Sequence, residues 1–172
     1  MKTVGHSFRI NEEYLAVLQE EAEKQTISVN ALMNKILQQY TVFGRFTERF
    51  GMITVGNHMF ADILECCPEE DLVRIGKTVG ASNAKDFFRT MGVTLDFKTM
   101  IYIITKVFCG PAGWAKCDHY VASGKEILHF RHNLGANWSK FIAATVSSLF
   151  ESFLDKKVIV ELLRNAVTLT IE

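Results

Sequence analysis

The first forty residues hold one short strand pattern and two short helix patterns, and this combination constrains the fold more than any other feature. Over residues 7–10 polar and apolar side chains alternate, which is typical of a strand with one buried face. A unit of roughly 40 residues seldom buries enough apolar surface to be stable alone. A single strand would also leave both of its edges unpaired. We therefore expect a second copy of the chain to complete this segment.

Two helix starts follow the strand pattern. Asn11 is a favourable N-cap, and Glu12 and Glu13 would lie in the first turn, where the helix dipole favours negative charge. Ser28 would cap a second helix. Apolar residues recur at spacings of three and four in both segments: Tyr14, Leu15, Leu18 and Ala22, then Ala31, Leu32, Ile36, Leu37 and Tyr40. The sequence predicts two short amphipathic helices.

Pairing of the strand with its copy would give a two-stranded antiparallel ribbon lying on four helices. Phe8 and Ile10 would face the helices, and Ser7 and Arg9 would stand on the outer face. A two-stranded ribbon fits the major groove of B-DNA, where its side chains can reach base edges. The geometry therefore points to DNA as a partner.

These residues resemble the ribbon-helix-helix repressors of the Arc, MetJ and CopG type over residues 2–43. The likeness lies in Ser-Phe-Arg-Ile-Asn-Glu-Glu-Tyr-Leu and in Ser-Val-Asn-Ala-Leu-Met-Asn-Lys-Ile-Leu. The resemblance implies a homodimeric transcriptional regulator, in which alternate strand residues read bases and the start of the second helix binds a phosphate. By position the DNA-binding residues are Gly5, Ser7 and Arg9 on the strand, Ser28, Val29 and Asn30 at the helix, and Lys2 and Thr3 in the arm.

Charge and turn chemistry depart from this pattern. The formal net charge of the chain is zero, and residues 1–45 carry equal numbers of basic and acidic side chains, which weakens non-specific attraction to DNA. Gly5 has no side chain for base readout, and Gln25-Thr26 stands where many family members have a glycine. In the alternative interpretation the segment only dimerises the chain or forms a helical hairpin of a larger fold.

Beyond residue 57 the pattern changes to longer apolar helices and then to strands. Helices are expected over 58–66, 69–79 (stopped by Gly80), 83–91 and 96–108, followed by strands 117–122 and 126–132, a helix over 138–154 capped by Asn137, and strands 157–163 and 166–171. This order suggests an α+β domain with an antiparallel sheet of ββαββ connectivity. We expect a ribbon-helix-helix domain over 1–45, a linker over 46–57 and an α+β sensor or oligomerisation domain over 58–172.

The first predicted hairpin carries a potential metal site. With a three-residue loop over 123–125, His119 would lie opposite His129 and close to Cys117, and these three could bind zinc or nickel. A two-residue loop would shift the register by one and separate them. Polar side chains facing solvent are the alternative.

Several function classes are disfavoured. No phosphate-binding glycine loop, nucleophile elbow or zinc-protease motif is present, so we do not expect an enzyme. No run approaches the roughly 18–20 apolar residues that span a bilayer, and we expect no membrane partner. The four cysteines are a poor disulfide framework, which favours reduced thiols and a cytoplasmic location. The expectation is a homodimeric or tetrameric repressor whose second domain senses a small-molecule effector or a metal, or assembles the protein.

Overall fold

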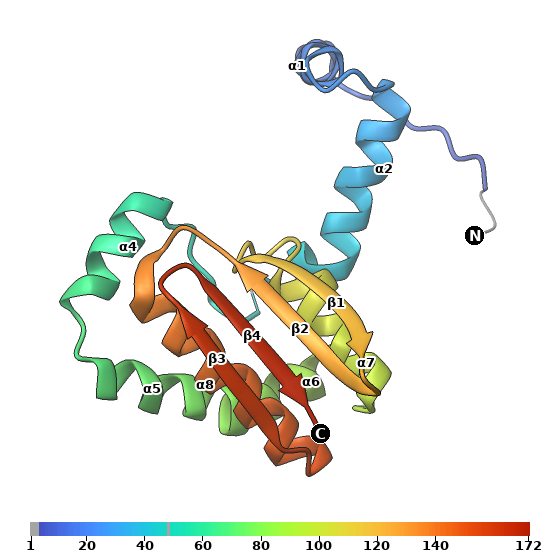
Figure 1. Cartoon of the computed structure of the whole chain (residues 1–172). Coiled ribbons are helices and arrows are strands. Elements are labelled where there is room, and N and C mark those ends of the chain that lie inside the picture. The colour runs from blue at the N-terminus through green and yellow to red at the C-terminus, as the bar shows by residue number, and fades with distance from the viewer. Residues whose placement is uncertain (1–3, 48) are drawn as a thin grey trace. The chain divides into compact units, whose positions relative to one another are not determined.

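The computed structural model describes residues 4–47 and 49–172. The chain divides into two compact units, Met1–Gly44 and Arg45–Glu172 (Figure 1).

The first unit consists of an extended segment and two helices. The helices are α1 (Glu12–Lys24) and α2 (Val29–Gln39), followed by the π-helical turn η1 (Tyr40–Gly44). Asn11 Oδ1 accepts a hydrogen bond from the Glu13 N–H at 3.0 Å, and Ser28 Oγ accepts one from the Ala31 N–H at 3.1 Å. Both predicted helices and the caps at Asn11 and Ser28 are confirmed.

The strand predicted over 7–10 is not formed in the single chain, where residues 4–11 adopt neither helix nor strand. A strand is defined by hydrogen bonds to a neighbouring strand, and the described part of the first unit supplies none. Asn11, with φ −63° and ψ 138°, is in the extended region, and α1 begins immediately after it.

The second unit is built on a four-stranded antiparallel sheet. Its strands are β1 (Lys116–Ala122), β2 (Lys125–Arg131), β3 (Val158–Leu163) and β4 (Ala166–Ile171), in the spatial order β1-β2-β4-β3. The long helix α8 (Gly135–Leu154) connects the two hairpins. The predicted α+β class and the ββαββ order of the C-terminal part are confirmed.

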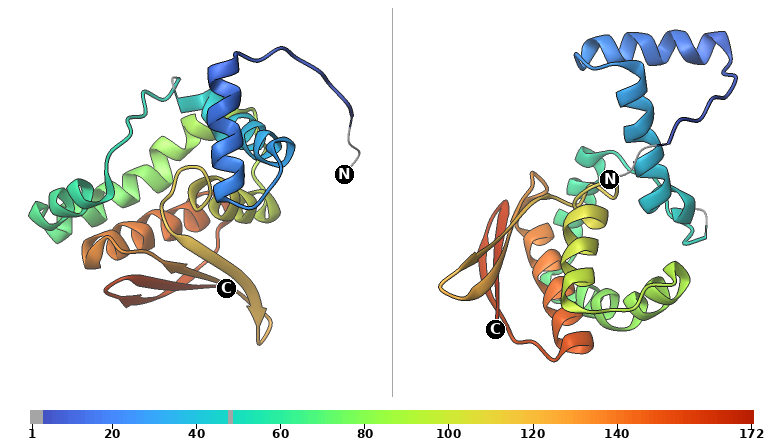
Figure 2. Two further views of the ribbon diagram at one scale, coloured as in Figure 1. Left: turned by 90° about the horizontal axis from the view of Figure 1, so that it is seen from above. Right: turned by 90° about the vertical axis from the view of Figure 1, so that its right-hand side faces the viewer.

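Helices precede the sheet. They are α3 (Arg45–Thr47), α4 (Asn57–Cys66), α5 (Glu69–Thr78), α6 (Ala84–Met91) and α7 (Phe97–Tyr102), with the π-helical turns η2 (Val79–Asn83) after α5 and η3 (Ile103–Phe108) after α7. Figure 2 shows α8 between the sheet and the green and yellow helices, and α8 contacts α5, η2, β3 and β4.

The core forms around α8 because this helix is apolar on more than one side. Ile142, Val146 and Phe150 of α8 are buried, and so are Leu128 of β2 and Leu169 of β4. Buried residues alternate along β4, so one face of the sheet packs on α8. The opposite face carries half-buried and exposed side chains.

Two glycines bring α5 and η2 into close contact with α8. A Cβ added at Gly76 would lie 2.9 Å from Ala144 Cβ, and one at Gly80 would lie 2.2 Å from the carbonyl oxygen of Thr145. Gly80 was expected to stop the helix. It lies instead inside a continuous helical segment, where the absence of a side chain permits the helix crossing.

Residues 46–57, expected as a linker, lie within the second unit. Phe46 is buried, and the ring of Phe50 stacks on Phe87 with centroids 4.7 Å apart. Asn137 was expected to cap α8, but that helix begins two residues earlier. The Asn137 side-chain amide donates to the carbonyl oxygens of Leu64 at 2.7 Å and Cys67 at 3.4 Å, and so joins the end of α4 to α8.

Candidate functional site

The residues expected to read bases lie in the extended segment before α1. Gly5, Ser7 and Arg9 are all exposed. Within the described part of the chain the guanidinium of Arg9 makes no ion pair. Lys2 and Thr3, expected to add contacts from the arm, lie outside the described residues. The structure therefore leaves the three described strand positions accessible.

The residues expected to bind a phosphate lie together at the start of α2. Ser28 is the N-cap, and Val29 and Asn30 are the first two helical residues. Backbone N–H groups in a first helical turn have no partner within the helix, and the helix dipole favours an anion there. In this unit that position is adjacent to the turn that joins the two helices.

The turn between the two helices closes without a glycine. Thr26 adopts φ 55°, in the left-handed region. The N–H of Thr26 donates to the Glu23 carbonyl, and that of Ile27 to the Ala22 carbonyl, both at 3.0 Å. These are the bonds of a glycine-type helix C-terminus, formed here at some steric cost by a β-branched residue.

Basic side chains elsewhere in the first unit are engaged in the turn region. Lys24 pairs with Glu20 at 2.7 Å, and Lys35 Nζ donates to Gln25 Oε1 at 3.1 Å. Arg9 therefore differs from these two lysines, because its charge is not committed within the described residues.

The apolar side chains of the first unit are poorly covered. Among residues 4–44, the buried side chains are Ala22 and Leu32. Phe8 is 59% exposed and Leu37 is 49% exposed. Further large apolar side chains are exposed in the same unit: Val4, Tyr14, Val17, Ile27, Ile36 and Tyr40. A unit of this size with so small an internal core needs another surface to pack against.

The hairpin expected to bind metal has a different register from the one that the site requires. Cys117 lies opposite Phe130, His119 opposite Leu128 and Ala122 opposite Lys125, so the loop is the two residues Ser123 and Gly124. Directly opposed residues share a face of the sheet. Cys117 and His119 are therefore on the α8 face with Leu128, whereas His129 is on the opposite face.

The three predicted ligands consequently have other partners. His119 Nε2 lies 2.6 Å from Glu126 Oε2, and His129 Nδ1 lies 3.0 Å from Thr168 Oγ1. Within residues 4–47 and 49–172 no group of three or more His, Cys, Asp or Glu side chains could hold a metal ion. The predicted zinc or nickel site at Cys117, His119 and His129 is wrong, since the one-residue shift separates its ligands.

Cys117 instead meets Cys109 at the end of η3. A hydrogen bond with the Cys117 thiol, followed by burial, raises the pKa of the Cys109 thiol. All four cysteines are free. Cys109 is thus a neutral thiol at physiological pH.

His132 follows β2 and forms a hydrogen-bond chain that sequence reasoning did not anticipate. Its Nδ1 accepts from the Leu134 N–H at 3.2 Å, so its Nε2 carries the proton and donates to Ser139 Oγ at 2.9 Å. Ser139 donates in turn to the Leu163 carbonyl at 2.8 Å. Burial lowers the pKa of His132, which agrees with a neutral ring.

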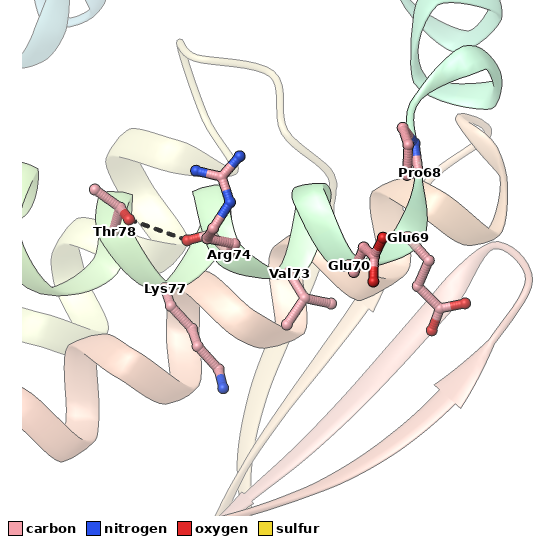
Figure 3. Close-up of a pocket in the computed structure, with 7 residues that line it drawn as sticks. All are labelled: Pro68, Glu69, Glu70, Val73, Arg74, Lys77 and Thr78. Carbon is pink, nitrogen blue, oxygen red and sulfur yellow. Dashed lines mark hydrogen bonds between the residues drawn. The ribbon is translucent and has the colours of Figure 1, made fainter.

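A shallow groove runs along the outside of α5 (Figure 3). Two of its charged side chains are already paired, Glu69 with Lys140 at 2.6 Å and Arg74 with Asp71 at 2.8 Å. Its lining comes from one helix and the proline before it: Pro68, Glu69, Glu70, Val73, Arg74, Lys77 and Thr78. This groove is a surface feature of a single helix.

A comparison with models of known protein families finds no match, and a comparison with curated protein sequences finds none either. Within the described residues no helix has the length and apolar character needed to cross a membrane.

Proposed function

We propose that the chain is a DNA-binding transcriptional regulator whose first unit acts as a ribbon-helix-helix dimer. The first unit holds two capped helices after an extended, unpaired segment. The proposal depends chiefly on the large apolar side chains that this unit leaves exposed. Phe8 in that extended segment is 59% exposed, as expected of an aromatic side chain that is buried only when a partner is bound.

A second copy would satisfy both needs of this unit. Antiparallel pairing of two extended segments would give each backbone the hydrogen bonds that it lacks in the single chain. The ribbon would place Phe8 and Ile10 against the half-buried Leu15 and Leu18 of α1. Ser7 and Arg9 of both copies would remain on the outer face.

Arg9 supplies the recognition chemistry. An arginine on a ribbon in the major groove can donate two hydrogen bonds to the O6 and N7 atoms of guanine. Ser28, Val29 and Asn30 would bind a backbone phosphate and so set the position of the ribbon in the groove. Two-fold symmetry of the dimer predicts a palindromic operator.

The test is a fluorescence-anisotropy titration of the full chain with duplex DNA from upstream of its own gene. Wild-type protein should bind one such duplex at least tenfold more tightly than a scrambled duplex. Replacing Arg9 by Ala should remove this preference, because a bidentate arginine–guanine contact contributes about 1–3 kcal/mol of discrimination. The matched control is Arg164→Ala, which removes an exposed arginine from the second unit.

A wild-type chain that binds both duplexes equally, or an Arg9→Ala variant that keeps the preference, would contradict the proposal. The equal numbers of basic and acidic residues over 1–45 favour a second candidate, a unit that dimerises the chain without contacting DNA. That candidate predicts a dimer in solution and no binding to any duplex at physiological salt.

A further inference from the structure

The strand β3 forms one edge of the sheet and carries apolar side chains on both of its faces. Ile159 is 42% exposed, Val160 38%, Leu162 47% and Leu163 68%. Edge strands of this kind pair readily with other chains, and proteins usually protect them with charges or proline. The opposite edge, β1, carries the exposed charged residues Lys116 and Asp118 together with exposed Tyr120 and Val121, whereas Glu161 is the one charged residue within β3.

The free backbone groups of β3 can be assigned from its pairing with β4. The Glu172 N–H donates to the Lys157 carbonyl at 2.9 Å, so the backbone groups of residue 157 point toward β4. Inward and outward directions alternate along a strand in an antiparallel pair. Val158, Val160 and Leu162 therefore direct their N–H and C=O groups away from the sheet.

We propose that β3 pairs antiparallel with β3 of a second copy, with the two-fold axis at Ile159. In this register Val158 lies opposite the partner's Val160, and these are residues whose backbone groups face outward. Lys157 lies opposite the partner's Glu161, and the symmetry of the pair repeats that contact. The register is selected by charge complementarity, because it places opposite charges directly across the interface on both sides of the axis.

The pairing also extends a row of side chains on the open face of the sheet. Tyr120 lies opposite Ile127, Ile127 opposite Thr170, and Thr170 opposite Ile159. Tyr120 is 48% exposed. Contact of Ile159 with its symmetry mate continues this row across the axis and joins the two sheets into one of eight strands.

This interface differs from the N-terminal ribbon and stands without it. If the same two chains share both interfaces, the protein is a closed dimer. If the interfaces join different chains, the smallest closed assembly that satisfies both is a tetramer with two ribbons. The second unit would then act as the assembly domain of the regulator.

The test is disulfide trapping in the full chain. The variant Ile159→Cys places two thiols at a non-hydrogen-bonded pair on the axis, where antiparallel Cα atoms are roughly 4.5 Å apart and a disulfide can form. Oxidation with diamide should give a covalent dimer on a non-reducing gel. Leu163→Cys is the matched control, because that residue is more exposed than Ile159 but lies four residues from the axis. Wild-type protein controls for the four native cysteines.

Charge substitutions in the Ile159→Cys background test the register itself. Glu161→Lys should slow cross-linking roughly tenfold, because it opposes like charges twice in the interface. Adding Lys157→Glu exchanges the two charges and should restore the rate. The proposal is overturned if Leu163→Cys cross-links as fast as Ile159→Cys, if neither cross-links, or if the charge exchange does not restore cross-linking. These results are independent of DNA binding, so failure here and failure of the ribbon are distinguishable.

Discussion

The two units of this chain differ in how they complete their cores. The second unit buries Phe130, Phe150 and Met100 inside a single chain, with α8 between a sheet and helices. In the first unit, over residues 4–44, the buried side chains are Ala22 and Leu32. A domain of about 130 residues can bury most of its apolar surface, whereas one of about 40 residues cannot.

Exposed apolar side chains therefore have a different origin in each unit. In the first unit they are spread over the extended segment and both helices, so the fold itself requires a partner. In the second unit four of them lie on the edge strand β3, and others are exposed on helices, on β1 and at residues 52–53, outside a core that is buried within one chain. A partner would complete the fold of the first unit, whereas it would only extend the second.

The largest expected effect concerns the self-sufficient core of the second unit. Gly80→Ala would place a methyl group 2.2 Å from the Thr145 carbonyl oxygen, on backbone that cannot rotate away. Because η2 and α8 must separate to admit it, we expect the free energy of unfolding of this unit to fall by about 3 kcal/mol. Urea unfolding followed by circular dichroism measures the change.

Gly76→Ala should lower the free energy of unfolding by less than Gly80→Ala. Its added methyl group would meet Ala144 Cβ at 2.9 Å, which is a less severe overlap. Lys77→Ala is the matched control, because Lys77 is exposed on the same helix. Equal stability of Gly80→Ala and wild type would show that η2 and α8 do not pack as described.

A second prediction concerns the dependence of the first unit on a partner. Phe8→Glu should abolish dimerisation through the ribbon, because it places a charge where an aromatic ring is expected to be buried. The loss should be on the order of 2 kcal/mol per chain, the transfer free energy of one large apolar side chain. Thermal unfolding of the wild-type first unit should depend on protein concentration, and that of the variant should not.

Ser7→Glu is the matched control for Phe8→Glu. The neighbouring residue would face outward, so this variant should keep the concentration dependence and lose only DNA binding. If wild-type unfolding of the first unit is independent of concentration, that unit is complete as a monomer and the contrast between the two units disappears.

The positions of most elements could be predicted from local patterns. Helices α1 and α2, the hairpin strands and α8 follow from periodicities of 3.6 and 2 together with the caps at Asn11 and Ser28. Such signals lie within a few residues of the structure that they specify. They are therefore readable without knowledge of the tertiary fold.

The register of the first hairpin was not predictable in the same way. Ser123 and Gly124 have φ 52° and 75°, the left-handed pair that closes a two-residue loop. Serine at the first of these positions only weakly indicates a two-residue loop. The alternative three-residue loop would shift the register by one residue and give every side chain of the hairpin different cross-strand neighbours. Gly80 shows the same limit, because its role depends on Thr145, which is 65 residues away in sequence.

The smallest expected effect is a pH dependence of the free energy of unfolding of the second unit. Burial lowers the pKa of His132, and its Nδ1 accepts from the Leu134 N–H, so protonation would remove that acceptor. The unfolded chain takes up a proton near pH 6.5, the ordinary pKa of histidine, whereas the folded chain does so only at lower pH. The unfolded state therefore binds more protons in this window, and acid lowers stability.

His132→Gln should consequently flatten the loss of stability of the second unit as the pH falls below about 6.5. The variant also loses the bond to Ser139, so its stability should be lower than that of wild type at neutral pH, and the slope is the informative quantity. Urea unfolding midpoints measured between pH 8 and 5 give both values. An unchanged slope would mean that His132 is not held neutral by the fold, and that the hydrogen-bond chain to Leu163 does not make the second unit sensitive to pH.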